Sequence, residues 1–369
     1  MRLNGDKVYL LRRPIETKEA DFEEYRSLAV DALAGLEFEL PASGTVLLKP
    51  NATVLFPAAK RIVTHPGFQA GVVDTLVERG VGPERIVIGD GQSGENPDDD
   101  KTWKGAGYTD MAESRGVALL PFNDTDTRLV EVPGAEVFDS FPIYSAVTDC
   151  SFFFNLPLTK CHNLGCSTLN VKNLMGVLGR PERHLCAVQE VDKDLGDDTW
   201  RLTDNGLSVF EDRFYRKLCD TLAAFRALEI PRLCVVDGLI GRDGTAFNEG
   251  DNYPLGICVV GENEVHVDAV ATYLMGLDPL VTPYLVYASE RGLGSNDVSR
   301  IEVVDIETGA TLTIPELAAA RAERVFMPTA SGPDGYYDRF RADGTVVPWR
   351  LGDVNERRVL DGLEPISAA

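Results

Sequence analysis

Long apolar runs are absent from this chain of 369 residues: none approaches the roughly 18–20 residues that a membrane-spanning helix needs. No long apolar stretch follows the basic pair Arg12-Arg13, so we expect no secretory signal. Basic residues are in the minority, because 36 Lys and Arg stand against 58 Asp and Glu for a net charge of −22. That sign repels nucleic acid and anionic membranes. We therefore predict a cytoplasmic protein with no nucleic-acid partner and no membrane partner.

Cysteine and histidine are scarce, with seven and four residues. The cysteines are odd in number and spread thinly between residues 150 and 258, which excludes the disulfide framework of a small secreted domain. The remaining composition, with 44% hydrophobic and 25% charged residues, is that of a globular protein. The length favours two to three domains, since a domain averages about 100–200 residues.

Short apolar runs alternate with helical patterns along the chain. Residues 45–48 and 85–91 have the pattern of buried strands, and the spacing of Phe68, Val72 and Leu76 predicts a helix over about 66–80 between them. A strand, a helix and a strand in this order form a βαβ unit and hence a parallel sheet. The alternation continues with helices expected near 105–116, 168–178 and 205–228, strands at 117–120, 150–157 and 233–238, and a hairpin of 257–261 with 265–268.

The predicted fold class is α/β, with mostly parallel sheets, flanking helices and two lobes that have a site between them. Residues 1–150 form the N-terminal α/β lobe, and residues 151–311 form a second α/β lobe. The pattern weakens after about residue 310, so we expect residues 312–369 to be a C-terminal extension.

A polar loop with an unusual density of reactive side chains follows the predicted strand at 150–157. The end of a parallel strand lies at the carboxyl edge of the sheet, where open α/β folds bind ligands. We expect Ser167 or Thr168 to cap the next helix, and a helix N-terminus attracts anions. Lys172 would then lie in the first turn, where the helix dipole disfavours a cation. This placement suggests that a bound anion supplies the compensating charge.

Three kinds of chemistry fit this loop. Cys161, His162 and Cys166, with His184 from the next loop, are ligand types for zinc, iron or nickel. Cys161 and Cys166 are also a candidate redox pair. In the third interpretation, which we favour, His162, Lys172 and Cys161 are catalytic and the loop binds an anion.

Other polar residues of the loop, and residues that follow the predicted strands, complete a candidate binding site. Because the carboxyl ends of parallel strands share one edge, these side chains are expected to lie close together. The candidate substrate-binding residues are Lys49, Asn51, Asp90, Lys160, Ser167, Asn170, Asn173 and Asp237.

The most specific motif of the sequence is Lys160-Cys161-His162 followed by Asn170-Val171-Lys172-Asn173. Shorter stretches accompany it: Leu48-Lys49-Pro50-Asn51, His65-Pro66, Ile88-Gly89-Asp90-Gly91, Val235-Val236-Asp237 and Val267-Asp268-Ala269. With these segments the chain resembles the DUF362 family of uncharacterised proteins over roughly residues 45–295. Many members carry a ferredoxin-like iron–sulfur module, whose clustered cysteines this chain lacks. The resemblance implies no assigned activity.

A second resemblance, to nickel-pincer lactate racemases, rests on the order of a few residues. His162 precedes Lys172 by ten positions, Gly165-Cys166-Ser167 lies between them, and His184 follows. In that family the lysine anchors the cofactor, and the resemblance implies a two-domain α/β architecture. Where the racemases have a catalytic histidine, this chain has Gly89-Asp90-Gly91.

The sequence therefore predicts an enzyme that acts on a small anionic metabolite at a site formed by Lys160, Cys161, His162 and Lys172. The reaction would be isomerase- or racemase-like, or assisted by a metal. The alternative is a protein that binds or carries a metal or cofactor without turnover. Neither the substrate nor the oligomeric state follows from the sequence.

Overall fold

The computed structural model describes residues 1–52, 61–91, 103–162, 164–179, 185–186, 189–200, 203, 207, 209–244 and 250–322. Within these ranges, one large sheet has the strand order β12-β1-β11-β10-β7-β2-β3-β4, and β8 and β9 extend it beside β10. Its strands are β1 (Lys7–Arg12), β2 (Val46–Pro50), β3 (Ile86–Asp90), β4 (Ala118–Pro121), β7 (Phe152–Leu156), β8 (Leu158–His162), β9 (Cys166–Ser167), β10 (Arg232–Arg242), β11 (Asn252–Gly261) and β12 (Glu302–Asp305).

Most strand pairs of the sheet are parallel, which confirms the predicted α/β class. The strands β10, β7, β2, β3 and β4 run in one direction. β11 is antiparallel to both β10 and β1. β7 and β8 follow one another along β10 and are separated by Pro157, so the polar loop continues the sheet where a turn was expected.

The predicted lobe boundary at residue 150 runs through this sheet. β7, which follows that boundary, lies between β2 and β10, with Leu48 opposite Phe154 and Cys234 opposite Asn155. Strands from both sides of the boundary therefore share one set of backbone hydrogen bonds. Independent folding of residues 1–150 remains a prediction.

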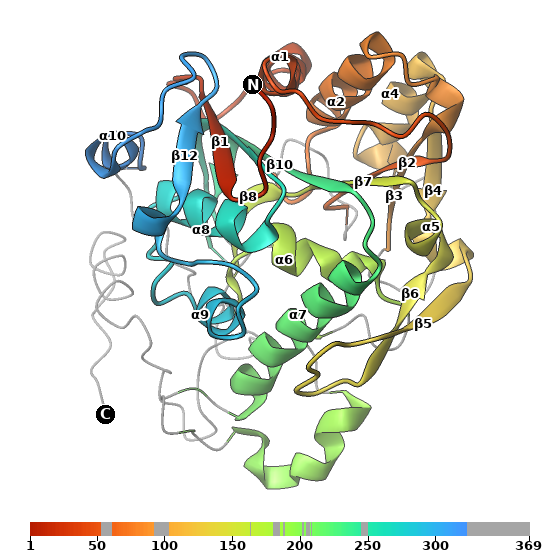
Figure 1. The fold of residues 1–369 in the computed structure, drawn as a ribbon, viewed down its shortest axis with the longest axis vertical. Coiled ribbons are helices and arrows are strands. Elements are labelled where there is room, and N and C mark those ends of the chain that lie inside the picture. Colours follow the sequence, from red (N-terminus) through yellow and green to blue (C-terminus); the bar gives the residue numbers. More distant parts are fainter. Residues whose placement is uncertain are drawn as a thin grey trace.

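Helices cover both faces of the sheet (Figure 1). The helices α1 (Phe22–Ala34), α2 (Pro66–Glu78) and α4 (Tyr108–Arg115) lie on one face, and α6 (Asn170–Asn173), α7 (Val209–Ala227), α8 (Glu264–Leu274) and α9 (Pro283–Glu290) lie on the other. Alternating strand side chains form two cores: Tyr9 and Leu11 pack toward α1 and α2, whereas Val8 and Leu10 pack toward α8.

The remaining described elements lie at the margins. They are the hairpin of β5 (Thr127–Glu131) and β6 (Ser140–Tyr144), the short helix α5 (Ser145–Thr148), and α10 (Ile314–Ala319). Within the described ranges, no helix is both long and apolar enough to cross a bilayer. All seven cysteines are free thiols.

The predicted hairpin of 257–261 with 265–268 is wrong. Residues 264–274 form α8, because the side chain of Asn263 accepts hydrogen bonds from the backbone N–H of Val265 and His266 at 3.0 and 3.2 Å. Val265 and Val267 are both buried in the first turns of this helix, so their alternation imitates a strand. The N-cap decides between the two structures.

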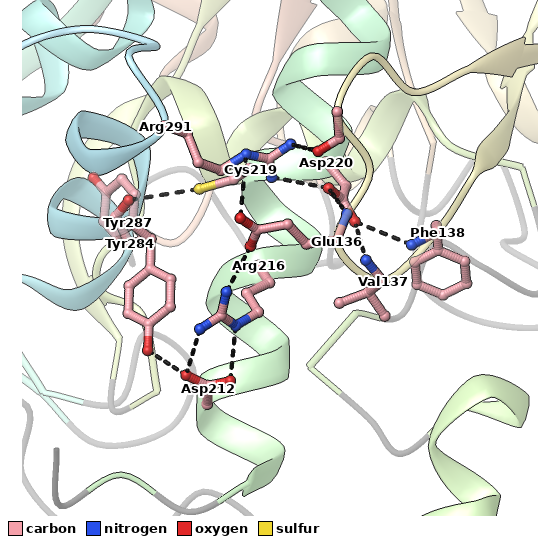
Figure 2. Close-up of polar contacts among 11 residues, drawn as sticks. Glu136, Val137, Phe138, Asp212, Arg216, Cys219, Asp220, Tyr284, Tyr287 and Arg291 are labelled. Atoms are coloured by element: carbon pink, nitrogen blue, oxygen red, sulfur yellow. Dashed lines mark hydrogen bonds and ion pairs between the residues drawn. The ribbon is translucent and has the colours of Figure 1, made fainter. Parts of the chain in front are cut away.

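A network of charged side chains fixes α9 and the β5–β6 hairpin against α7 (Figure 2). Asp220 of α7 accepts hydrogen bonds from the backbone N–H of residues 136–138 and pairs with Arg291 after α9 at 2.8 Å. Arg216 bridges Asp212 and Glu136, and Tyr287 of α9 donates to Asp212. This network holds α9 in place, and α9 carries Tyr284 toward the site described next.

Candidate functional site

A buried ion pair lies at the carboxyl ends of β2 and β3. Lys49 Nζ is 2.7 Å from Asp90 Oδ1, and the two side chains are 1% and 2% exposed. The other carboxylate oxygen of Asp90 accepts the backbone N–H of Ala52 at 2.7 Å. A Cβ on Gly176 would lie 2.2 Å from Asp90 Oδ1, so only glycine allows the chain to pass this close. Two residues predicted from their strand-end positions are thus brought together.

Three asparagines connect this ion pair to α6. Asn173 Oδ1 accepts from Lys49 Nζ at 3.1 Å and from Asn51 Nδ2 at 3.2 Å. Its amide nitrogen donates to Asn155 Oδ1 at 2.7 Å. Asn155 in turn donates to the backbone carbonyl of Asn170 at 3.0 Å. The predicted residues Lys49, Asn51 and Asn173 therefore belong to one buried hydrogen-bond network, and sequence reasoning missed Asn155 as a member.

Lys160 of β8 joins the same network. Its Nζ donates to Asn51 Oδ1 at 3.0 Å and to the carbonyl of Ile62 at 2.7 Å. The side chain is 2% exposed. Burial lowers the pKa of Lys160 well below its usual range, and the charges of Lys172 and Arg242 lower it further. Any negative charge that approaches this lysine is therefore attracted to it and favours its protonated form.

The orientation of His162 is fixed by the turn that follows it. Its Nδ1 accepts the backbone N–H of Leu164 at 3.0 Å and of Gly165 at 3.2 Å. A nitrogen that accepts hydrogen bonds carries no proton, so the neutral ring holds its proton on Nε2. Burial and then the charges of Lys172 and Lys160 lower the pKa of His162 well below its usual range. Cys166 in the same turn has a positive φ of 63°, a strained conformation for a residue with a Cβ.

Lys172 lies on the opposite side of this turn. Its methylene chain covers Gly165, where a Cβ would lie 3.1 Å from Lys172 Cδ. The residue is half-buried, in contrast to Lys49 and Lys160. Within the described part of the chain, its amino group has no hydrogen bond and no ion pair. Burial lowers the pKa of Lys172.

The expectation that Ser167 or Thr168 caps the helix of Lys172 is wrong. Asp268 of α8 caps α6: its Oδ1 accepts the backbone N–H of Asn170 at 2.8 Å, and its Oδ2 accepts that of Val171 at 2.9 Å. Asp268 thus brings its own negative charge to the start of α6, which removes the argument that a ligand must supply it. Burial raises the pKa of Asp268 to about 7.

Ser167 and Asn170 belong to this second network. Ser167 Oγ lies 2.9 Å from Thr272 Oγ1 and 3.1 Å from Tyr284 Oη. Tyr284 donates to Asp268 at 3.2 Å, and Asn170 Nδ2 donates to Asp268 at 2.8 Å. These contacts hold α6 against α8 and α9. A role for Ser167 and Asn170 in ligand binding remains a prediction.

Asp237 lies beside a cation that the sequence analysis missed. Its Oδ2 is 3.0 Å from Arg61 Nη2 and accepts the backbone N–H of His65 at 3.1 Å. Arg61 is 2% exposed and has a positive φ of 54°, and its Nη1 has no hydrogen-bond partner among the described residues. His65 caps α2 and stacks on Tyr25, and burial lowers its pKa to about 3. A positive φ in a non-glycine residue leaves no sequence signal.

The predicted metal ligands do not all share one face. Cys161 and His162 alternate along β8, and the register sets His162 opposite Cys166 but Cys161 opposite Ser167. The side chain of Cys161 belongs to the apolar core on the α7 and α8 side. Among the described residues, no group of three or more His, Cys, Asp or Glu side chains is arranged to hold a metal. His184 lies outside the described residues, so the metal set and a catalytic Cys161 remain predictions.

Comparison with known families covers most of the residues of the site. A model described as a domain of unknown function, DUF362, matches residues 46–273, which is more than half of the chain. The chain belongs to the DUF362 family. The first resemblance drawn from the sequence is thereby confirmed, and the matched region extends from Lys49 to Asp268 and includes the loop of β8 and α6. The family description states no activity.

A named relative adds a location but no chemistry. A thylakoid-associated protein of Synechocystis sp. strain PCC 6803 is 24% identical over 297 residues, which cover 78% of this chain and 76% of the relative. Its name states no ligand and no reaction. The likeness to lactate racemases remains a prediction.

Proposed function

We propose that the protein binds a small anionic metabolite at the carboxyl edge of its sheet, and that it is an enzyme in which His162 acts as acid or base. Lys160 and Lys172 supply the positive charge for the anion. The observation that carries the proposal is Lys172, a half-buried lysine whose methylene chain covers the turn of His162 and whose amino group has no hydrogen bond or ion pair among the described residues.

The arrangement of charges supports an anionic ligand. Lys160 donates to two neutral oxygens, those of Asn51 and Ile62, and its buried side chain lies close to the positive charges of Lys172 and Arg242. Arg61 adds a buried donor, because its Nη1 has no hydrogen-bond partner among the described residues. Buried charges are costly unless they are compensated. An anion bound between these cations would lower that cost.

The hydrogen bonds of His162 support a role in proton transfer. The two N–H groups that bond Nδ1 hold the ring in one tautomer, so that Nε2 is the nitrogen that carries or accepts a proton. Its lowered pKa keeps the free ring neutral at pH 7. In this tautomer the neutral imidazole donates a hydrogen bond from Nε2–H.

Thermal unfolding with added anions tests the proposal. We expect sulfate and oxalate to raise the melting temperature of the parent protein and to raise that of Lys172→Ala much less. Without anions, Lys172→Ala should melt at or above the parent temperature, because burial already disfavours the lysine charge. The loss of one charge-assisted contact corresponds to a tenfold to hundredfold weaker affinity, or about 1.5–3 kcal/mol.

Lys193→Ala is the matched control, because Lys193 is a lysine with a side chain 63% exposed. It should keep the full anion-induced shift, and it corrects for the general effect of salts on protein stability. A Lys172→Ala protein that melts lower than the parent but keeps the full shift would contradict the proposal.

The alternative function, a metal or cofactor carrier without turnover, is tested by elemental analysis of the purified protein. Stoichiometric zinc, iron or nickel that disappears in a Cys161→Ala/Cys166→Ala variant would favour a carrier or a metalloenzyme. The cytoplasmic location predicted from the sequence belongs to the same proposal. Fractionation of cells into soluble and membrane parts tests it.

A further inference from the structure

We propose that Lys172 is an amine nucleophile that forms an imine with the carbonyl group of a small anionic oxo acid. This inference rests on the proposed function, because it assumes that the same site attracts the anion. It adds the chemical class of the substrate and a covalent step.

The three lysines of the site differ in how their amino groups are held. Lys49 is bonded to Asp90 and Asn173, and Lys160 is bonded to Asn51 and Ile62. In these contacts the amino groups donate hydrogen bonds, and both side chains are almost fully buried. Lys172 has no acceptor among the described residues and keeps part of its surface exposed. Its amino group is therefore the one of the three that no hydrogen bond to the described residues occupies.

The packing of Lys172 restricts its approach. Its Cδ and Cε lie over Gly165, at 3.1 and 3.2 Å from the position that a Cβ would take. Gly165 donates its backbone N–H to His162, so the lysine chain covers the turn that orients the imidazole. Asp268 fixes the start of α6 through two backbone hydrogen bonds. The amino group is thus carried on a rigid support beside the turn that orients His162.

The surroundings favour the uncharged amine, which is the reactive form. Burial lowers the pKa of Lys172, and burial followed by the charge of Lys172 lowers the pKa of Lys160, so the two amino groups lie close enough to interact. A lysine that is desolvated near another cation is the arrangement that activates amines for imine formation. The charge of Lys160 also attracts the carboxylate of an oxo acid.

The step conserves atoms and electrons and needs no oxidant. The lone pair of Lys172 Nζ attacks the carbonyl carbon, and the carbonyl oxygen takes up a proton to give a carbinolamine. The C–O bond then breaks, water leaves with that oxygen, and the nitrogen loses its remaining proton to form the C=N bond. The two protons that the nitrogen loses equal the two that the departing oxygen takes up, so the step balances.

Reductive trapping with glyoxylate and sodium cyanoborohydride tests the inference on the full-length protein. Glyoxylate carries an aldehyde and a carboxylate, and reduction of its imine leaves a carboxymethyl group that peptide mass spectrometry locates. We expect Lys172 to be labelled at least about tenfold faster than the exposed Lys193, as one charge-assisted contact to the carboxylate would give. With acetaldehyde, which has no charge, this preference should largely disappear.

Lys172→Arg is the matched variant, because arginine keeps a cation for the anion but has no amine that forms an imine. It should keep most of the sulfate-induced shift and lose the glyoxylate label. Labelling of Lys172 no faster than Lys193 would overturn the imine, and an unchanged sulfate shift in the same sample would leave the anion site standing. Equal preference for acetaldehyde and glyoxylate would overturn the assignment to oxo acids.

Discussion

Replacement of Gly176 by alanine should destabilise the protein through the ion pair of Lys49 and Asp90. Gly176 lies in the short 3₁₀ helix Leu174–Val177 and has no positive φ, so alanine fits its backbone. The added Cβ would lie 2.2 Å from Asp90 Oδ1 and 2.8 Å from Lys49 Nζ, whereas ordinary contacts begin at 3.4 Å. One of the two charged groups, or the backbone of Gly176, has to move by about 1 Å.

None of these movements is easy. Lys49 and Asp90 are 1% and 2% exposed, so neither side chain can turn into water. The carbonyl of Gly176 accepts the N–H of Gly91 at 3.0 Å, which ties this segment to the end of β3. Overpacking costs about 1–3 kcal/mol, and disruption of a buried ion pair costs about 3–5 kcal/mol. Alanine also restricts the unfolded chain more than glycine does, which raises the free energy of unfolding by about 0.4–1 kcal/mol. These two costs are alternatives: the net loss is up to about 2.6 kcal/mol if the ion pair only shifts and about 2–4.6 kcal/mol if it breaks, so we expect about 2–3 kcal/mol, where the two ranges meet.

Urea unfolding measures this loss as a lower transition midpoint at an unchanged slope. Gly105→Ala is the control, because nothing lies within 4 Å of its added Cβ. It should change the stability by less than about 0.5 kcal/mol or raise it slightly. Asp90→Ala combined with Gly176→Ala should cost at least about 1 kcal/mol less than the sum of the two single changes. A Gly176→Ala protein as stable as Gly105→Ala, or strictly additive costs, would refute the reasoning.

Three further predictions use the same unfolding assay or calorimetry. Asp268→Ala should lower the free energy of unfolding by at least about 3 kcal/mol, because it leaves the buried backbone N–H groups of Asn170 and Val171 without an acceptor and removes one partner of the Tyr284 hydroxyl. Asp268→Asn keeps one acceptor oxygen, so its loss in the free energy of unfolding should be smaller. Equal losses for the two variants would show that the charge of Asp268, and not its hydrogen bonds, stabilises the protein. Asp220→Ala should cost about 2–5 kcal/mol, because residues 136–138 and Arg291 lose their shared acceptor, whereas the exposed Asp194→Ala should be neutral within about 0.5 kcal/mol. Binding of sulfate should take up protons and tighten as the pH falls, because Lys160, Lys172 and His162 have lowered pKa values that a bound anion raises. Calorimetry in two buffers of different ionisation enthalpy measures this proton uptake. A release of protons on binding would contradict the proposed arrangement of charges.

Local patterns in the sequence determined most of the elements and the location of the site. The buried strands at 46–50, 86–90 and 152–156 and the helix at 66–78 follow from apolar runs and helical spacing, and a βαβ order implies parallel strands. Because parallel strands end at one edge, the sequence predicts that Lys49, Asp90 and Asn173 lie close together, although it does not predict which of them are in contact. These inferences need only information within a few tens of residues.

Only the tertiary structure decided which groups meet within that neighbourhood. Asp268 caps a helix 98 positions before it in the chain, and Arg61 meets Asp237 from a loop whose strained backbone has no signature in the sequence. The same distant contact gave α6 its negative charge, so the helix start needs no ligand while Lys172 still lacks a partner in the described residues. Hydrogen bonds between segments far apart in the chain depend on the packing of whole helices on the sheet. A local pattern therefore indicates where charged residues gather, but the folded chain decides which charges are balanced.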